Sequence, residues 1–180
     1  MLLALAAMFL QQMFASVGKV LPAVRDVLKI AAEQKLVVHT GHLSPIEALA
    51  VVEAGRDMGV DRLVVTHAQF EVVNMSLDQM KKAASMGAKL ELCAMGTIMG
   101  PSAHLAWMRN WRQVKVEETA AAIKEVGAQN FVLATDLGQT GNPSPPDGLQ
   151  IFVTDHVKAG IGKDEVVTMG REVTGKLLMG

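Results

Sequence analysis

Short apolar runs alternate with amphipathic segments along most of the chain. Apolar residues at i, i+3, i+4 and i+7 after Pro22 predict a helix over residues 22–31, since proline is accepted in the first helical turn. The run at residues 36–38, rich in β-branched side chains, is typical of a buried strand. The polar loop 39–42 follows it, so the first repeat reads as helix, strand and loop.

The same order of strand and helix then recurs. Capping boxes, in which a serine precedes a Glu or Gln by three residues, open two helices at Ser44 and Ser76. An irregular stretch covers 94–114, and a Pro/Gly-rich loop covers 138–148. Apolar runs predict further strands at 62–67, 89–93 and 131–136, and periodicity predicts helices over 45–58, 77–87, 117–126, 149–158 and 163–171.

This alternation predicts an α/β fold with about four parallel strands and right-handed crossover helices. Four such units make half of a (β/α)8 barrel, and a full barrel needs about 250 residues. The chain has 180 residues, so we expect a partial barrel, its carboxyl-terminal half, over 21–180 and an apolar helix or extension over 1–20. A small doubly wound sheet is the competing fold, but no strand is followed by its Gly-x-Gly-x-x-Gly fingerprint.

The first nine residues are entirely apolar, which allows two interpretations. They resemble the h-region of a signal peptide over residues 1–16, but the first basic residue is Lys19 and none precedes the apolar run. Gln11 and Gln12 interrupt the run well short of the ~20 apolar residues that a membrane span requires. We therefore favour a buried or partner-facing helix and expect no membrane span.

Charge and cysteine content exclude two classes of protein, nucleic-acid binders and disulfide-stabilised scaffolds. The chain carries 17 basic and 18 acidic side chains without a basic cluster, so we expect no nucleic-acid binding. A single cysteine, Cys93, excludes an internal disulfide framework and agrees with a reducing, cytoplasmic location.

Candidate chemistry gathers where the predicted strands end. In parallel α/β folds, the loops at the carboxyl ends of the strands surround a common site. Here these ends supply imidazoles, carboxylates and a thiol: His39 or His42, His67, Glu91 or Cys93, and Asp136. Imidazoles with a carboxylate are ligands for Zn²⁺ and related metals, and a bound metal lowers the pKa of its water towards ~7.

Each residue also has a structural interpretation. A single strand-end histidine is more often a hydrogen-bonded structural residue, but two of them with a strand-end aspartate favour metal binding. Cys93 lacks a Cys-x-x-Cys partner or a neighbouring cation and reads as a small buried hydrophobe. Glu91 alternates with leucines, so it is expected to point into the barrel, where a lysine or a metal would have to balance its charge.

Two further histidines and one loop are assigned structural roles. His104 lies near two tryptophans and two arginines in a segment that reads as a packed lid or interface. His156 is expected at the surface of its helix. The loop 136–143 lacks the Lys-Ser/Thr ending of a phosphate-binding P-loop, so its glycines and prolines are expected to set turns.

At three blocks the sequence resembles a known family. Residues 39–47 (HTGHLSPIE), 64–67 (VVTH) and 133–143 (LATDLGQTGNP) are similar to the carboxyl-terminal half of an uncharacterised domain family among the amidohydrolase-like, metal-dependent TIM barrels. The resemblance covers about residues 21–180. It implies that His42, His67 and Asp136 bind a divalent metal, Zn²⁺ or Mn²⁺, and that Asp136 is also the general base. The implied reaction is attack of metal-activated water on an amide, ester or similar bond of a small-molecule substrate.

One departure from the family pattern affects the predicted function. The His-x-His pair of the family's first strand has no counterpart here, and His39 and His42 have the wrong spacing for it. The chain is therefore expected to be a truncated hydrolase or to pair with a second half-barrel or a second copy. The alternative is a non-catalytic half-barrel that acts as an oligomeric or binding module, because four strands leave two unpaired edges.

Overall fold

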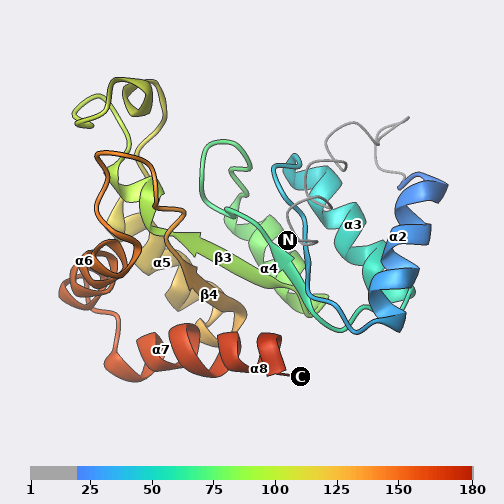
Figure 1. Ribbon diagram of the computed structural model, residues 1–180. Helices are drawn as coiled ribbons and strands as arrows, with labels where there is room; N and C mark the ends of the chain where they lie inside the picture. The colour runs from blue at the N-terminus through green and yellow to red at the C-terminus, as the bar shows by residue number, and fades with distance from the viewer. Residues whose placement is uncertain (1–19, 180) are drawn as a thin grey trace. The chain divides into compact units, whose positions relative to one another are not determined.

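A computed structural model describes residues 20–179, which fold as helices around one parallel β-sheet (Figure 1). The strand order is β1-β2-β3-β4, the same as the order along the chain, and β1, β2 and β3 pair in parallel. Helices connect the strands, as right-handed βαβ units require. The predicted α/β fold with four parallel strands and crossover helices is confirmed, and it is consistent with half of an α/β barrel.

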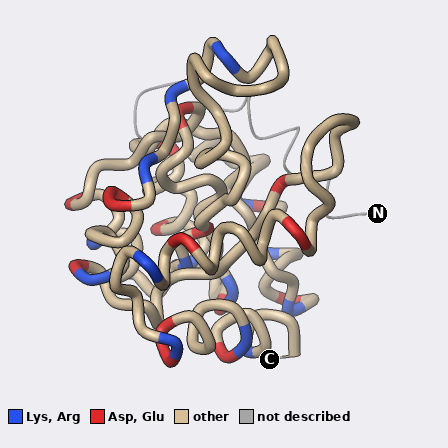
Figure 2. Tube along the Cα trace, turned by 90° about the vertical axis from the view of Figure 1, so that its left-hand side faces the viewer, with Lys and Arg blue, Asp and Glu red and all other residues tan. Residues whose placement is uncertain are grey.

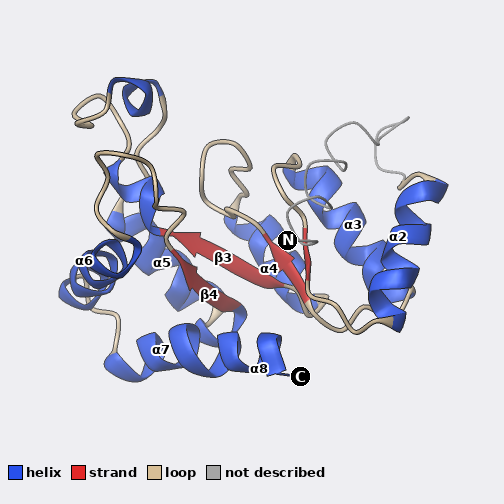
Figure 3. Ribbon diagram, viewed as in Figure 1, coloured by secondary structure: helices blue, strands red, loops and turns tan. Residues whose placement is uncertain are grey.

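The strands are short and the helices account for most of the regular structure (Figure 3). The strands are β1 (Val38–His39), β2 (Leu63–Val65), β3 (Lys89–Cys93) and β4 (Phe131–Ala134). The helices are α2 (Pro22–Glu33), α3 (Pro45–Asp57), α4 (Leu77–Ser85), α5 (Val116–Val126), α6 (Pro145–Lys158), α7 (Lys163–Val167) and α8 (Thr174–Met179), with 3₁₀ turns at Ala94–Ile98, Ala106–Asn110 and Ala128–Asn130.

The chain divides into two compact units, and one boundary between them falls inside β3. The described part of unit 1 comprises residues 20–68 and 72–90, which hold α2 to α4, β1, β2 and the start of β3. Unit 2 comprises residues 69–71 and 91–179, which hold the end of β3, β4 and the remaining helices.

The core of unit 1 forms where α2 packs against α3 and α3 packs against β2. The buried residues of α2 are Val24, Leu28 and Ala31, three of the four positions in the predicted apolar stripe, whereas the fourth, Val27, is exposed. All of β2 is buried, and α3 approaches it closely because Gly55 has no side chain. A Cβ atom at Gly55 would lie 2.9 Å from the Leu63 Cδ2, so a larger residue would require the Leu63 side chain to shift.

The two predicted capping boxes are present in unit 1. At α4, the Ser76 hydroxyl accepts a hydrogen bond from the Gln79 backbone N–H at 3.3 Å, and the Ser76 N–H donates to the Gln79 Oε1 at 2.8 Å. At α3, the Ser44 N–H donates to the Glu47 Oε2 at 3.0 Å. These bonds satisfy N–H groups that the first helical turn would otherwise leave without partners.

Unit 2 packs its helices around the end of β3 and around β4. Phe131, Ile123, Phe152 and Met169 are buried in its core. Helix α6 begins at Pro145 rather than at Leu149 as predicted. The reason is local, because the Ser144 hydroxyl caps the Asp147 N–H and proline fits the first helical turn.

Two other predicted boundaries are wrong. The last helix was expected to end near Arg171, but α7 continues through a π-helical turn at Thr168–Val173 into α8. The first strand lies at Val38–His39 instead of 36–38, because Val38 pairs with Leu63 of β2 and Leu36 is exposed.

The predicted extension over residues 1–20 and the alternative signal segment lie, apart from residue 20, outside the described residues. In the described part of the chain, no helix combines the length and the apolar character that crossing a membrane requires. Lys and Arg alternate with Asp and Glu along the trace in Figure 2, without a long segment of one sign.

Candidate metal centre

Three of the four strands are followed, at the same position, by a residue with a positive φ angle. Two residues beyond β1, β2 and β4 stand Gly41, His67 and Asp136, whose φ angles are +64°, +51° and +52°. A threonine precedes each of them: Thr40, Thr66 and Thr135. A left-handed backbone is ordinary for glycine but costs other L-residues free energy, which is least for Asn and Asp.

In unit 1 two predicted metal ligands lie close together. The ring centroids of His42 and His67 lie 5.1 Å apart, and the ring planes are tilted by 35°. His67 is buried, with 6% of its surface exposed, whereas His42 is exposed. The pair therefore places one imidazole inside the unit and one at its surface.

In unit 2 a second pair of possible ligands forms at the ends of β3 and β4. The Cys93 Sγ and a carboxylate oxygen of Asp136 lie within 4.8 Å of each other. The Cys93 S–H also donates to the Thr135 carbonyl oxygen at 3.5 Å, and that oxygen accepts a second bond from the Met95 N–H at 3.0 Å. The Gln139 amide donates to the Asp136 carbonyl oxygen at 2.8 Å, which fixes the turn that carries the carboxylate.

Three described residues are possible metal ligands: His67 in unit 1, and Cys93 and Asp136 in unit 2. They offer an imidazole nitrogen, a thiol sulfur and a carboxylate oxygen, and Zn²⁺ accepts all three donor types. Thiolates are poor ligands for Mn²⁺, which prefers oxygen. The donor types therefore fit a divalent metal ion.

Cys93 is the member of this group whose sequence context predicts a small buried hydrophobe and not a ligand. It is buried, as expected of a small hydrophobe, yet its thiol lies beside the Asp136 carboxylate. The signal in the sequence is position, because Cys93 is the last residue of β3, and candidate ligands follow the neighbouring strands β2 and β4 two residues after their ends.

Two other predicted site residues, His39 and Glu91, are not members of this group. His39 is exposed on β1 in unit 1, and its side chain is not among the grouped ligands. Glu91 is buried in β3 with 7% of its surface exposed. Neither residue gains a metal-binding role from the structure.

The segment around His104 is fastened to the loop that follows β4. The His104 Nε2 and the Gly141 carbonyl oxygen are 2.7 Å apart, and this bond requires the ring nitrogen to donate. The Arg109 guanidinium donates to the backbone oxygens of Ala103 at 2.8 Å and of His104 at 3.3 Å. These bonds tie the segment to the loop after β4, with His104 as a structural donor, while His104 and Trp107 remain exposed.

Residues 69–71 are held in unit 2 by one arginine. Arg112 donates from Nη1 to both carboxylate oxygens of Glu118, at 2.8 and 3.1 Å, and from Nη2 to the Gln69 carbonyl oxygen at 2.8 Å. Its backbone N–H also donates to the Glu71 carboxylate. This network fixes the chain two residues after His67.

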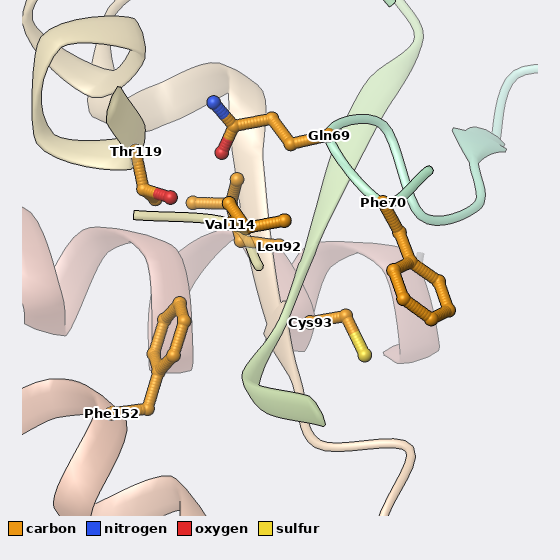
Figure 4. A pocket seen from close by; sticks show the side chains of 7 residues that line it. All are labelled: Gln69, Phe70, Leu92, Cys93, Val114, Thr119 and Phe152. Atoms are coloured by element: carbon orange, nitrogen blue, oxygen red, sulfur yellow. The ribbon is translucent and has the colours of Figure 1, made fainter. Parts of the chain in front are cut away.

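A small cavity of about 10 Å³ lies within unit 2, large enough for about one water molecule (Figure 4). In Figure 4 the amide of Gln69 and the hydroxyl of Thr119 face each other across one side of it. Its remaining lining is mostly apolar: Phe70, Leu92, Cys93, Val114 and Phe152. A cavity of this size does not admit an organic substrate.

His156 is buried and not at the helix surface, so that prediction is wrong. Its ring packs against Phe152 with the centroids 4.0 Å apart, and its Nδ1 lies 2.6 Å from the Phe152 carbonyl oxygen. Burial lowers the pKa of His156, and the hydrogen bond to the backbone opposes this shift only in part.

Comparisons with known proteins add one match. Residues 10–91 match the model of a family of unknown function, DUF6282. This range includes His39, His42 and His67 but ends before Cys93 and Asp136. No curated protein and no solved structure matches the chain. The description of the matched family names no activity, so function has to be argued from the residues themselves.

Proposed function

We propose that the chain is a metal-dependent hydrolase of the amidohydrolase type, with a divalent metal bound by His67 and Asp136. The observation that carries the proposal is the shared backbone conformation of these two residues. Both are held at φ near +50° at the same position after their strands, where glycine stands after β1. Left-handed residues other than glycine cost about 1–2 kcal/mol, and such strain is concentrated at functional sites.

Cys93 and His42 are the further ligands in this proposal. The Cys93 thiolate adds a sulfur donor beside Asp136, and the His42 ring lies 5.1 Å from that of His67. In the sheet order β1-β2-β3-β4, Cys93 ends β3, and His42, His67 and Asp136 follow β1, β2 and β4. The carboxyl ends of parallel strands share one edge of a sheet. A thiolate among the ligands makes Zn²⁺ our choice over Mn²⁺.

The proposed chemistry is attack of water on a small-molecule amide, ester or similar bond. Zinc, when bound, lowers the pKa of its water towards ~7, so that hydroxide is available at neutral pH. Asp136 is exposed, and its second carboxylate oxygen is suited to accept the proton as general base. We place the protein in the cytoplasm, because a single cysteine agrees with a reducing compartment.

The test is metal analysis of the purified chain with matched variants. We expect about one zinc ion per chain, as for a mononuclear site, and loss of the metal from His67→Ala and Asp136→Ala. Cys93→Ser should weaken zinc binding more than it weakens Mn²⁺ binding. His104→Ala removes an exposed histidine outside the group and should keep the metal.

Activity is then measured with a panel of simple amides and esters. Zinc-loaded wild-type chain and His104→Ala should hydrolyse at least one class, and Asp136→Ala should not. A wild-type chain that holds no zinc and takes none up on titration contradicts the proposal.

The second candidate is a non-catalytic half-barrel that functions as an oligomer or binding module. It is favoured by the two edge strands of the sheet, β1 and β4, and by exposed apolar side chains on α2, Val27 and Ile30. Both features are typical of surfaces that bind another chain.

A further inference from the structure

We propose that Thr40 and Thr66 are positioning residues that hold His42 and His67 in place. This inference rests on the proposed metal binding and assigns a role to two side chains that contact no ligand themselves. All the residues involved belong to unit 1.

The two threonines exchange hydrogen bonds across the ends of β1 and β2. The backbone ladder ends where the Thr40 N–H donates to the Val64 carbonyl oxygen at 3.0 Å. Beyond that point, the Thr66 N–H donates to the Thr40 Oγ1 at 3.2 Å, and the Gly41 N–H donates to the Thr66 Oγ1 at 3.0 Å. Side-chain hydroxyls thus replace backbone carbonyls as acceptors, and the two segments that follow β1 and β2 stay hydrogen-bonded beyond the end of the sheet.

Each of these bonds acts on the residue directly before a histidine. Gly41 precedes His42, and Thr66 precedes His67, so the crossed pair fixes both peptide planes relative to each other. With the backbone held in this way, the His42 and His67 ring centroids lie 5.1 Å apart. Second-shell hydrogen bonds of this kind orient metal ligands, and their loss weakens metal binding.

Threonine suits this task for two reasons. Its β-branched side chain has few χ1 rotamers, so the hydroxyl is held in one direction. Thr40 is completely buried, so water cannot replace its oxygen as acceptor for the Thr66 N–H. Valine has nearly the same shape but no acceptor, and it would leave that N–H without a partner.

The experiment titrates Zn²⁺ alone into metal-free protein and compares valine and serine variants. We expect Thr40→Val and Thr66→Val to bind zinc about 10–100-fold more weakly than the wild type. Thr40→Ser and Thr66→Ser retain the hydroxyl and should recover most of the affinity. Thr119→Val is the matched control, because Thr119 is equally buried but lies on α5 in unit 2. Urea unfolding of each variant shows whether it is folded under the titration conditions.

A second measurement needs no metal. Amide hydrogen exchange should show the Gly41 and Thr66 N–H groups protected in the wild type. Thr66→Val should remove the protection of Gly41, and Thr40→Val that of Thr66, because each variant deletes one acceptor. Fast exchange of both amides in the wild type overturns the inference.

The outcomes separate the two proposals. If the wild type binds no zinc, the proposed function fails, whatever the exchange rates are. If the valine variants bind zinc as tightly as Thr119→Val, or lose stability without losing zinc affinity, only the positioning role is overturned.

Discussion

Asp136 stands in a backbone conformation that favours glycine, and we expect its carboxylate to be kept at the expense of stability. Its φ is +52°, and Gly41 occupies the matching position after β1. Asp136→Gly and Asp136→Ala remove the same carboxylate but differ in backbone freedom. We expect the glycine variant to be more stable than the alanine variant by about 1 kcal/mol, since alanine is strained at positive φ.

Urea unfolding measures this difference, and zinc titration measures the cost to function. Both variants should lose zinc binding, while the glycine variant keeps a free energy of unfolding close to that of the wild type. If alanine is as stable as glycine at this position, the strain assigned to Asp136 is absent.

His156 makes stability depend on pH. Its ring is buried against Phe152 with one nitrogen bonded to a backbone oxygen, and burial lowers its pKa below the ordinary value of 6.5. The unfolded chain therefore takes up a proton at a pH where the folded chain does not. The free energy of unfolding should be constant above about pH 6.5 and fall as the pH decreases below it.

The check is the urea midpoint of wild type and His156→Phe between pH 5 and 8. Phenylalanine keeps the aromatic packing and cannot be protonated, so its midpoint should change less below pH 6.5. His104→Gln replaces an exposed histidine and should keep the wild-type profile. Equal slopes for wild type and His156→Phe would show that another group titrates.

At the scale of elements, apolar periodicity predicted most helices because burial decides where they form. The buried residues of α2 follow the predicted spacing, and both serine capping boxes are formed. Predicted helix boundaries were wrong where two sequence signals compete. Pro145 was assigned to a loop on composition, although a serine cap followed by proline also opens a helix.

Register could not be predicted from a local pattern. The run at 36–38 has the composition of a strand, but β1 is defined by the pairing of Val38 with Leu63 and of His39 with Val64. That choice is made by a segment about one βαβ unit further along the chain. It moves the start of the strand by two residues and its end by one, and it leaves Leu36 exposed.

The site was predictable where position alone marks a residue. His67 and Asp136 follow apolar runs, so the end of a strand identifies them. The threonine hydrogen bonds were not predictable, because a threonine at a strand end also reads as a further β-branched strand residue. The burial of His156 was missed because the buried face of α6 includes Gly148, which gives no hydrophobic signal.

At the scale of the molecule, the sheet leaves β1 and β4 without a second neighbour in the described chain. Native sheets rarely leave edge strands uncovered, because the unpaired N–H and C=O groups bind other chains. Val27 and Ile30 are one turn apart on α2 and are 46% and 57% exposed, so the helix that precedes β1 presents an apolar face. A second copy of the chain would cover such a surface.

We therefore expect light scattering coupled to size exclusion to give the mass of a dimer. Ile30→Glu places a charge on the exposed face of α2 and should shift the equilibrium towards monomer, because burying an unpaired carboxylate is costly. Leu178→Glu is the matched control, since Leu178 is also exposed but lies on α8 in unit 2, and it should leave the mass unchanged. If the wild type is a monomer at every concentration tested, a homodimer is excluded. The apolar face of α2 then requires a different partner, and of the two proposed functions the oligomeric module loses its main support.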